Sequence, residues 1–169
     1  QRQMCIRDSD NVSFIVFMKH YFIFLILFSS NVTFALSDLE IIRVIDGDTV
    51  IGKSNDTEIK IRLSEIDAPE MNQPFGLNSK ECLSNLIKKN NNLQFKSNGR
   101  DGYGRSLGWL VTDDKNLNYE MIKEGCAWVY DRYVINKTIY SFQNGARLKN
   151  LGLWKQNNPI APWIWRRNN

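Results

Sequence analysis

Four carboxylates stand in two short turns of the sequence. Asp46 and Asp48 flank a glycine, and Asp67 and Glu70 flank an Ala-Pro pair. If the strands before these turns form a meander, both turns lie at the same end of a barrel. Ligand sets made only of oxygen atoms are those that hard cations such as Ca²⁺ and Mg²⁺ prefer. The alternative is ordinary turn chemistry, because Asp-Gly is a common hairpin signal and Asp caps turns.

Two arginines lie close to these acids in the sequence pattern. Arg62 falls on the polar face of an alternating segment shortly before Asp67, and Arg105 closes a glycine-rich loop. A guanidinium binds phosphate through two hydrogen bonds and stays charged at any working pH. Two of them beside a carboxylate-held cation could stabilise the charge that develops when a phosphodiester is hydrolysed. A single Arg on a strand is otherwise a solvated surface residue.

Aromatic residues offer a second kind of contact. Tyr103, Tyr130 and Tyr133 could stack on bases, which is the usual way in which single strands are held. The chain also has five Trp, and most of them are interpreted as core or tail packing.

Histidine chemistry is excluded for the main part of the chain. The one histidine is His20, which lies in an apolar N-terminal stretch. A Ser-His-Asp triad, Cys-His hydrolysis and His-based nucleases or ribonucleases are therefore not available. Any catalysis must use carboxylates, arginines, lysines or tyrosines.

The composition is that of one folded domain. The chain has 169 residues, of which 43% are hydrophobic, and a formal net charge of +4. This length suits a single domain with its own core. The mild basic excess permits an acidic partner without requiring one.

The N-terminal part is expected to lie outside this domain. Residues 1–17 begin with QRQMCIRDS, which resembles translated sequencing adapter, and we interpret them as a non-native leader. Residues 18–35 have a basic start, a short apolar run and small residues near a cleavage point, as in a secretory signal peptide. The apolar run is shorter than the roughly 20 residues that span a bilayer. We therefore expect a secreted or periplasmic protein without stable membrane association after cleavage, the alternative being an uncleaved signal anchor.

Hydrophobic periodicity predicts a small α+β domain over residues 36–156, followed by an irregular Pro- and Trp-rich tail over 157–169. Alternating and β-branched segments indicate strands, and apolar residues at helical spacing indicate helices. The predicted strands are 39–46, 49–53, 57–66, 93–96 and 105–112, and the predicted helices are 75–90, 117–124 and 137–150. Five short strands with a helix between the third and the fourth match the OB-fold, a five-stranded Greek-key barrel.

The cysteines leave two alternatives open. The three Cys of the chain lack the paired spacing of a zinc ribbon. Cys82 and Cys126 both lie downstream of the signal segment, so in an exported chain they could form a disulfide or remain two buried thiols.

The motifs taken together resemble the staphylococcal nuclease family. They are IDGDTV at 45–50, IRLSEIDAPE at 61–70, DGYGR at 101–105 and the Ala-Arg…Gly-Leu-Trp pattern at 146–154. Their order and spacing match the family over about residues 40–154. The resemblance implies an OB barrel with three helices and Ca²⁺-dependent hydrolysis of DNA and RNA that leaves 3′-phosphates. It also implies a monomer that prefers single-stranded or frayed substrate.

The resemblance further implies a role for individual residues. The implied calcium ligands are Asp48, Asp67 and the backbone carbonyl of Ala68. The implied catalytic residues are Arg62, Glu70 and Arg105, with Glu70 positioning or deprotonating the attacking water. The implied substrate contacts are Tyr103, Tyr130 and Tyr133. Gly102 stands where the family pattern has a lysine, and the loop at 71–74 is shorter than in that pattern.

Two alternatives belong to other functional classes. One is a non-catalytic OB-fold module that only binds nucleic acid, and the other is an envelope module that binds polysaccharide. Retention of both arginines and all three acids favours the enzyme. Digestion of a plasmid with Ca²⁺ and with a chelator distinguishes these readings.

Overall fold

The computed structural model describes residues 36–54 and 56–169. The leader and signal-peptide predictions fall on residues 1–35, which lie outside the described residues. In the part of the chain that is described, no helix has both the length and the apolar character needed to cross a membrane.

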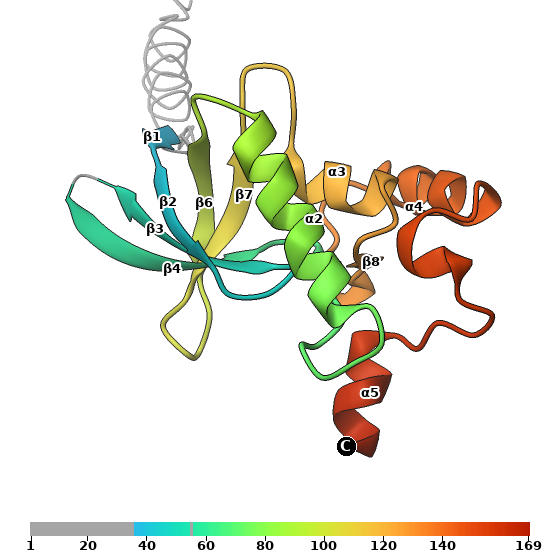
Figure 1. Cartoon of the computed structure of the whole chain (residues 1–169). Helices are drawn as coiled ribbons and strands as arrows, with labels where there is room; N and C mark the ends of the chain where they lie inside the picture. Colours follow the sequence, from blue (N-terminus) through green and yellow to red (C-terminus); the bar gives the residue numbers. More distant parts are fainter. Residues whose placement is uncertain (1–35, 55) are drawn as a thin grey trace, which may run out of the picture. The chain divides into compact units, whose positions relative to one another are not determined.

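A mixed six-stranded sheet forms the centre of the fold (Figure 1). Its strand order is β1-β6-β7-β4-β3-β2, and all neighbours are antiparallel except the parallel pair β4 and β7. The strands are β1 (Leu36–Asp38), β2 (Glu40–Val44), β3 (Thr49–Ser54), β4 (Thr57–Leu63), β6 (Gln94–Arg100) and β7 (Ser106–Val111). A second, two-stranded sheet pairs β5 (Ile66–Asp67) with β8 (Trp128–Val129).

An additional strand, β1, precedes the segment predicted as a strand over 39–46, which forms β2, and this corrects the predicted five-stranded Greek-key barrel. β1 pairs with β6 and β2 pairs with β3. The two edge strands of the sheet, β1 and β2, are therefore consecutive in the sequence. Leu39 lies between them and donates its backbone N–H to the carbonyl of Leu93 at 3.0 Å. Within the described residues β1 and β2 do not pair with each other, so the sheet has six strands and stays open between them.

The strand predicted over 57–66 is divided, because the chain turns at Ser64 and Glu65. Glu65 has a φ of 68°, a left-handed conformation that an extended strand does not allow. β4 therefore ends at Leu63, and β5 begins at Ile66 in the other sheet. This break places Asp67 opposite Trp128 of β8.

Four α-helices are present in the described residues, one more than predicted. α2 (Gly76–Lys89), α3 (Leu117–Lys123) and α4 (Ile139–Leu148) match the predicted helices to within two residues at each end. The fourth, α5 (Pro162–Asn168), lies in the tail that was predicted to be irregular. Pro162 suits the first turn of a helix, and Arg166 and Arg167 near its C-terminus suit the helix dipole.

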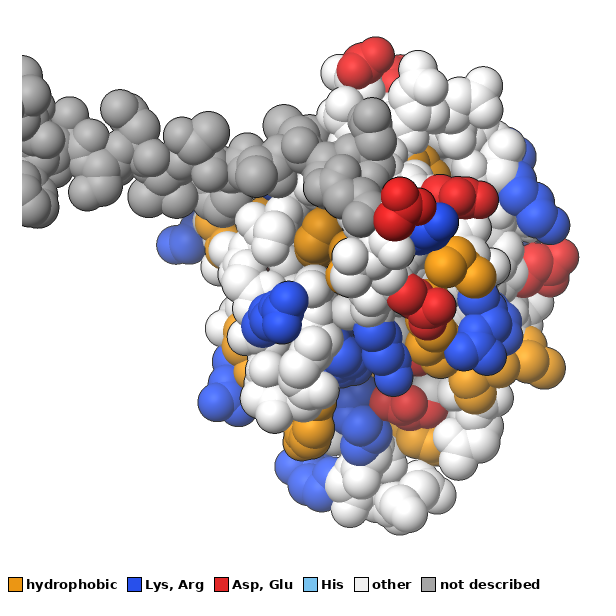
Figure 2. Space-filling model, turned by 90° about the vertical axis from the view of Figure 1, so that its left-hand side faces the viewer, with side chains coloured by type: hydrophobic (Ala, Val, Ile, Leu, Met, Phe, Trp, Pro, Cys, Tyr) orange, Lys and Arg blue, Asp and Glu red, His pale blue; other side chains and the backbone are white. Residues whose placement is uncertain are grey.

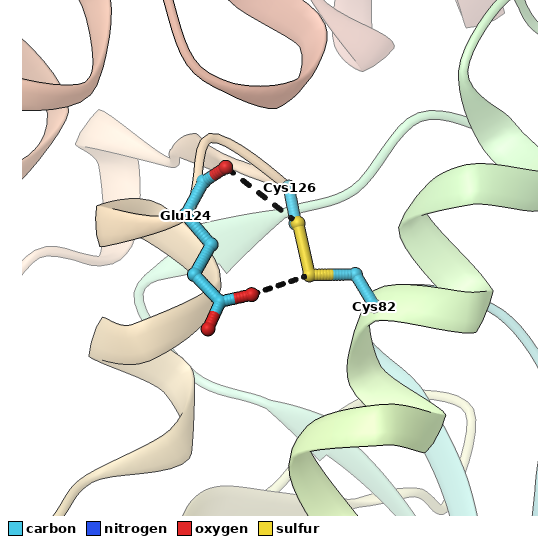
Figure 3. Close-up of side chains that lie close together, drawn as sticks. All are labelled: Cys82, Glu124 and Cys126. Carbon is cyan, nitrogen blue, oxygen red and sulfur yellow. Dashed lines mark hydrogen bonds between the residues drawn. A yellow bond between two sulfur atoms is a disulfide. The ribbon is translucent and has the colours of Figure 1, made fainter. Parts of the chain in front are cut away.

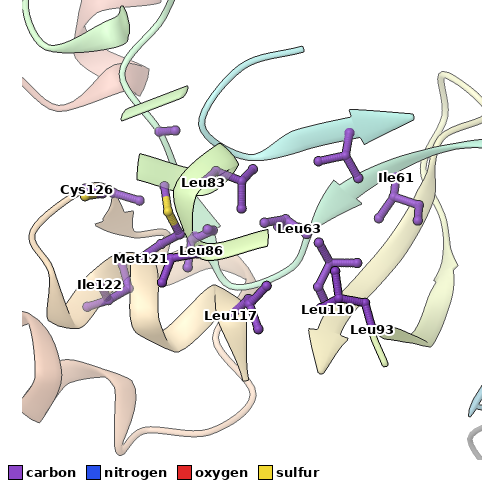
Figure 4. Packing of buried hydrophobic residues seen from close by; sticks show 14 of the residues in the cluster. Ile61, Leu63, Leu83, Leu86, Leu93, Leu110, Leu117, Met121, Ile122 and Cys126 are labelled. Atoms are coloured by element: carbon purple, nitrogen blue, oxygen red, sulfur yellow. The ribbon is translucent and has the colours of Figure 1, made fainter. Parts of the chain in front are cut away.

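The core lies between the sheet and helices α2 and α3 (Figure 4). Ile61 and Leu63 alternate along β4 and belong to the same buried cluster as Leu83 of α2 and Met121 of α3. All four side chains are at most 1% exposed. Burial of this size is the main favourable contribution to folding, at about 1.5–3 kcal/mol for each large apolar side chain.

A disulfide ties α2 to the segment that leads into β8. Cys82 and Cys126 are joined across a sequence separation of 44 residues, which decides between the two alternatives left open above. Glu124 lies beside both sulfur atoms (Figure 3), but bonded sulfurs are not thiolate ligands, so this group of side chains holds no metal in the oxidised protein.

Removal of the disulfide should destabilise the fold. Closing a loop of this length restricts the unfolded chain, so the Cys82→Ser, Cys126→Ser variant should lose about 3–5 kcal/mol of unfolding free energy. Urea denaturation measures this loss, and the wild-type protein under reducing conditions should show the same loss. Equal unfolding midpoints for the oxidised protein and the double variant would contradict the assignment.

Candidate active site

A tight turn brings Asp48 beside the start of the 68–75 loop. The backbone N–H of Asp48 donates to the Asp46 carboxylate at 3.0 Å, which fixes the turn. Gly47 sits so close to Ala68 and Ser79 that a Cβ at this position would lie 2.7 Å from the Ala68 Cβ and collide with the Ser79 hydroxyl. Glycine is therefore required here by space, and the close approach lets the Ala68 N–H donate to Asp48 Oδ2 at 2.7 Å.

Arg62 lies between two buried carboxylates. Its Nε is 3.1 Å from Asp48 Oδ1, and its Nη2 donates to Asp67 Oδ1 at 2.9 Å. Its Nη1 donates to the carbonyls of Leu63 and Ile66, at 2.6 and 2.9 Å. The guanidinium thus holds the end of β4, the start of β5 and the 46–48 turn in one arrangement.

Asp48 has an unusual acidity. Burial raises the pKa of its carboxyl to about 7, and the nearby charges of Asp46 and Asp67 act in the same direction. Arg62 and the hydrogen bond from Ala68 oppose this rise without cancelling it. A positive charge placed nearby would favour the charged form of this carboxyl group and lower its pKa.

Arg166 of α5, which the sequence analysis missed, completes the group. Its Nη2 lies 2.8 Å from Asp67 Oδ2, and its Nη1 lies 2.6 Å from Glu70 Oε1 and 3.2 Å from Asp67 Oδ1. The hydrogen bond to Asp67 raises the pKa of Arg166 still further above its ordinary value. We call Asp48, Asp67 and Glu70 the carboxylate cluster, which Arg62 and Arg166 hold together.

Arg105 and Tyr103 lie in the loop between β6 and β7. The ion pair of Arg105 joins its Nε to Asp101 Oδ2 at 2.7 Å, so the structure does not bring it into contact with the carboxylate cluster. Arg105 directly precedes β7, whose Leu107 is the register partner of Arg62. Burial works to raise the pKa of Asp101, but its hydrogen bonds with Arg105 and Tyr103 lower it overall. Tyr103 is 89% exposed, so its ring is open to a ligand.

Tyr130 and Tyr133 lie together in the segment after β8. Their rings meet edge to face with centroids 5.1 Å apart. The ring of Trp163, at the start of α5, stacks on Tyr130 with centroids 5.7 Å apart and an interplanar angle of 12°. Tyr133 is half-exposed. The ring of Trp163 is already stacked on the ring of Tyr130.

Glu65 positions residues 130–136, which carry Tyr130 and Tyr133 and which we call the tyrosine segment. Its buried carboxylate accepts hydrogen bonds from the backbone N–H groups of Ile135 and Asn136 and from the side chains of Trp109 and Tyr119, all at 2.7–2.9 Å. Its backbone carbonyl accepts from the N–H of Tyr130 at 2.9 Å. Burial, followed by the hydrogen bond to Glu65, raises the pKa of Tyr119 to about 12. The alternating pattern placed Glu65 on a strand and gave no sign of a buried carboxylate.

The donor set of this site fits a hard divalent cation. The carboxylate oxygens of Asp48 and Asp67 face the same guanidinium, and Glu70 is joined to Asp67 through Arg166. All candidate ligands are oxygen atoms, and the described residues near them include no histidine or cysteine ligand. Asp48, Asp67 and the Ala68 carbonyl are the residues that could hold Ca²⁺ or Mg²⁺.

Comparisons with known proteins agree on one family. The family model described as staphylococcal nuclease homologue matches residues 60–156. An "uncharacterized endonuclease" of Haemophilus influenzae is 42% identical over 75% of this chain and 71% of its own. An "uncharacterized endonuclease" of Escherichia coli O157:H7 is 36% identical over 88% of this chain and 97% of its own. A "micrococcal nuclease" of Shigella flexneri is 36% identical over 76% of this chain and 79% of its own.

The raised pKa of Asp48 predicts a pH dependence of stability. A carboxyl group that holds its proton more tightly when folded stabilises the protein below its unfolded pKa of 3.8, and this contribution is lost as the pH rises through about 7. Between these limits the wild type should lose stability relative to Asp48→Asn in chelator-treated solution. Urea unfolding of both proteins across this range measures the difference in unfolding free energy. A pH-independent difference would refute the prediction.

Proposed function

Because the chain belongs to the staphylococcal nuclease family, we propose that it hydrolyses phosphodiester bonds of DNA and RNA with the help of Ca²⁺, leaving 3′-phosphates. Membership of this family makes it a nuclease, and the ion, the substrates and the products are the proposed part. The observation that carries the proposal is the placement of the Asp48 and Asp67 carboxylates on one guanidinium, at 3.1 and 2.9 Å. Two acids held this close supply the anchor for a divalent ion.

The proposed ion would be held by Asp48, Asp67 and the carbonyl of Ala68, where it would supply positive charge next to the scissile phosphate. Glu70 is suited to receive a proton from the attacking water, because its side chain is 37% exposed while that of Asp67 is 2% exposed. A carboxylate must take this role in a domain whose described residues include no histidine.

The two arginines are proposed to act differently on the phosphate. Arg62 is 12% exposed and has its guanidinium nitrogens engaged with carboxylates and carbonyls, so its main effect is the fixed positive charge that it provides. Arg105 is 28% exposed on a loop, where Asp101 orients it. We propose that Arg105 clamps the phosphate directly and that Tyr103, Tyr130 and Tyr133 contact nucleotides.

Surface charge supports a polyanionic substrate. On the face that carries the β3 and β4 side of the sheet, Lys and Arg side chains gather over the middle and lower part (Figure 2). Such a surface attracts nucleic acid in a salt-dependent manner. Stacking on the tyrosines would favour single-stranded or frayed segments, and we propose that the enzyme acts as a monomer.

Export is proposed for the chain as well. The disulfide between Cys82 and Cys126 supports an oxidising compartment, such as the periplasm or the exterior of the cell. Ca²⁺ is abundant outside the cell, so a weak calcium site suffices there.

Loss of the base should reduce turnover by orders of magnitude without disturbing the fold. Glu70→Gln removes the proton acceptor but keeps an acceptor oxygen for Arg166, so we expect kcat to fall by about 10²–10⁴-fold. A plasmid digestion in Ca²⁺, with the product ends mapped, measures this. Glu58→Gln, an exposed acid on β4, is the matched control and should retain full activity. Wild-type activity in Glu70→Gln would remove Glu70 from the mechanism, and no wild-type cleavage with Ca²⁺ would favour a binding module.

Loss of Arg105 should reduce the rate through lost stabilisation of charge in the transition state. Arg105→Ala should lower kcat by about 10²–10³-fold with an unchanged unfolding midpoint. Arg100→Ala, at the end of β6 and also exposed, is the matched control. Steady-state cleavage of a short oligonucleotide separates kcat from KM. A rise in KM alone would show that Arg105 only binds substrate.

A further inference from the structure

The C-terminal helix α5 lies against the carboxylate cluster. Arg166 reaches both oxygens of Asp67 and one oxygen of Glu70, at distances from 2.6 to 3.2 Å. Arg166 lies 99 positions after Asp67 and 96 positions after Glu70 in the sequence. The tail therefore delivers a positive charge to the two acids that the proposed cation and the proposed water activation require.

Other contacts hold the tail in this position. Gln73 donates from Nε2 to the carbonyl of Ile160 at 2.6 Å, and Trp165 donates from Nε1 to Asn72 Oδ1 at 3.3 Å. Trp163 stacks on Tyr130 and meets Trp128 edge to face, with centroids 5.8 Å apart. The tail is thus fastened in the residues that precede Arg166, both to the loop after Glu70 and to the segment that carries Tyr130.

These contacts compete with those that a cation and a nucleotide need. Asp67 Oδ2 accepts from Arg166, and Asp67 Oδ1 accepts from both Arg62 and Arg166. A divalent ion on Asp67 would need oxygen lone pairs that point at Arg166, and its charge would repel the guanidinium at short range. In the same way, the ring of Trp163 covers a face of Tyr130 on which a base would stack.

We propose that α5 is an autoinhibitory strap in which Arg166 substitutes for the divalent cation, so that cation binding and the Arg166 contacts exclude one another. This inference rests on the proposed function for its consequence, because only a cation-dependent enzyme is switched in this way. The strap neutralises the carboxylate cluster when the cation is scarce, and rising cation concentration displaces it and opens the site to substrate.

Calcium binding without nucleic acid tests the proposal independently of activity. Arg166→Ala, titrated with Ca²⁺ by calorimetry, should bind with a dissociation constant about tenfold lower than that of the wild type, because no charged hydrogen bond has to be broken. The matched control is Arg167→Ala, the exposed neighbour on the same helix, which should bind as the wild type does. Calcium binding by Arg166→Ala alone would also support the strap. Equal or weaker binding by Arg166→Ala, or no binding by any of the three proteins, would overturn it.

Hydrogen exchange on the wild-type chain provides the second measurement. Saturating Ca²⁺ should speed amide exchange in residues 162–168, because the helix loses its anchor. Greater protection of these residues would overturn the strap and make Arg166 part of the cation-loaded site. Activity measurements then separate the strap from the proposed nuclease function. Tighter calcium binding by Arg166→Ala, without any cleavage of nucleic acid, would support the strap and contradict the proposed nuclease chemistry. Cleavage by the wild type with the same dependence on Ca²⁺ concentration in Arg166→Ala retains the nuclease and rejects the strap.

Discussion

The guanidinium of Arg62 between the carboxylates of Asp48 and Asp67 is the interaction on which the acidic site depends. Two buried carboxylates repel each other, and a charge removed from water is costly unless it is paired and hydrogen-bonded. Arg62 meets both requirements, since it contacts the two acids at 3.1 and 2.9 Å and also satisfies the carbonyls of Leu63 and Ile66. The compensation is incomplete, as the raised pKa of Asp48 shows. Burial outweighs the pairing at Asp48, and a further positive charge beside it would favour the charged form of that carboxyl group.

The surrounding fold positions the groups of this site. Gly47 allows the turn to approach Ala68, and the left-handed Glu65 ends β4 so that Asp67 enters the second sheet. The Glu65 carboxylate then gathers four donors from three separate parts of the chain. The break between β4 and β5 thus positions both Asp67 and the segment that carries Tyr130 and Tyr133.

The C-terminal tail gives the same site a second state. Arg166 supplies the charge that the carboxylates need when no cation is near, and the aromatic contacts of Trp163 hold the helix in place. Neighbouring carboxylates favour a positive charge beside them, and here a residue of the same chain supplies it. The proposed nuclease activity and its proposed inhibition by α5 then both follow from the preference of these carboxylates for a positive charge nearby.

The sequence by itself determined the helices α2, α3 and α4, most of the strands, and the motifs that bring Asp48, Arg62 and Asp67 into one turn-rich region. These follow from periodicity and turn residues, which are local properties that neighbouring residues decide. Only the tertiary structure decided the additional strand β1, the division of the predicted strand 57–66, the burial of Glu65 and the helix in the tail. Arg166 is the clearest case, because a charged residue near the end of a chain has no local pattern that names its partner. Its contact with Asp67 spans 99 positions, and packing of the whole chain had to bring the two together.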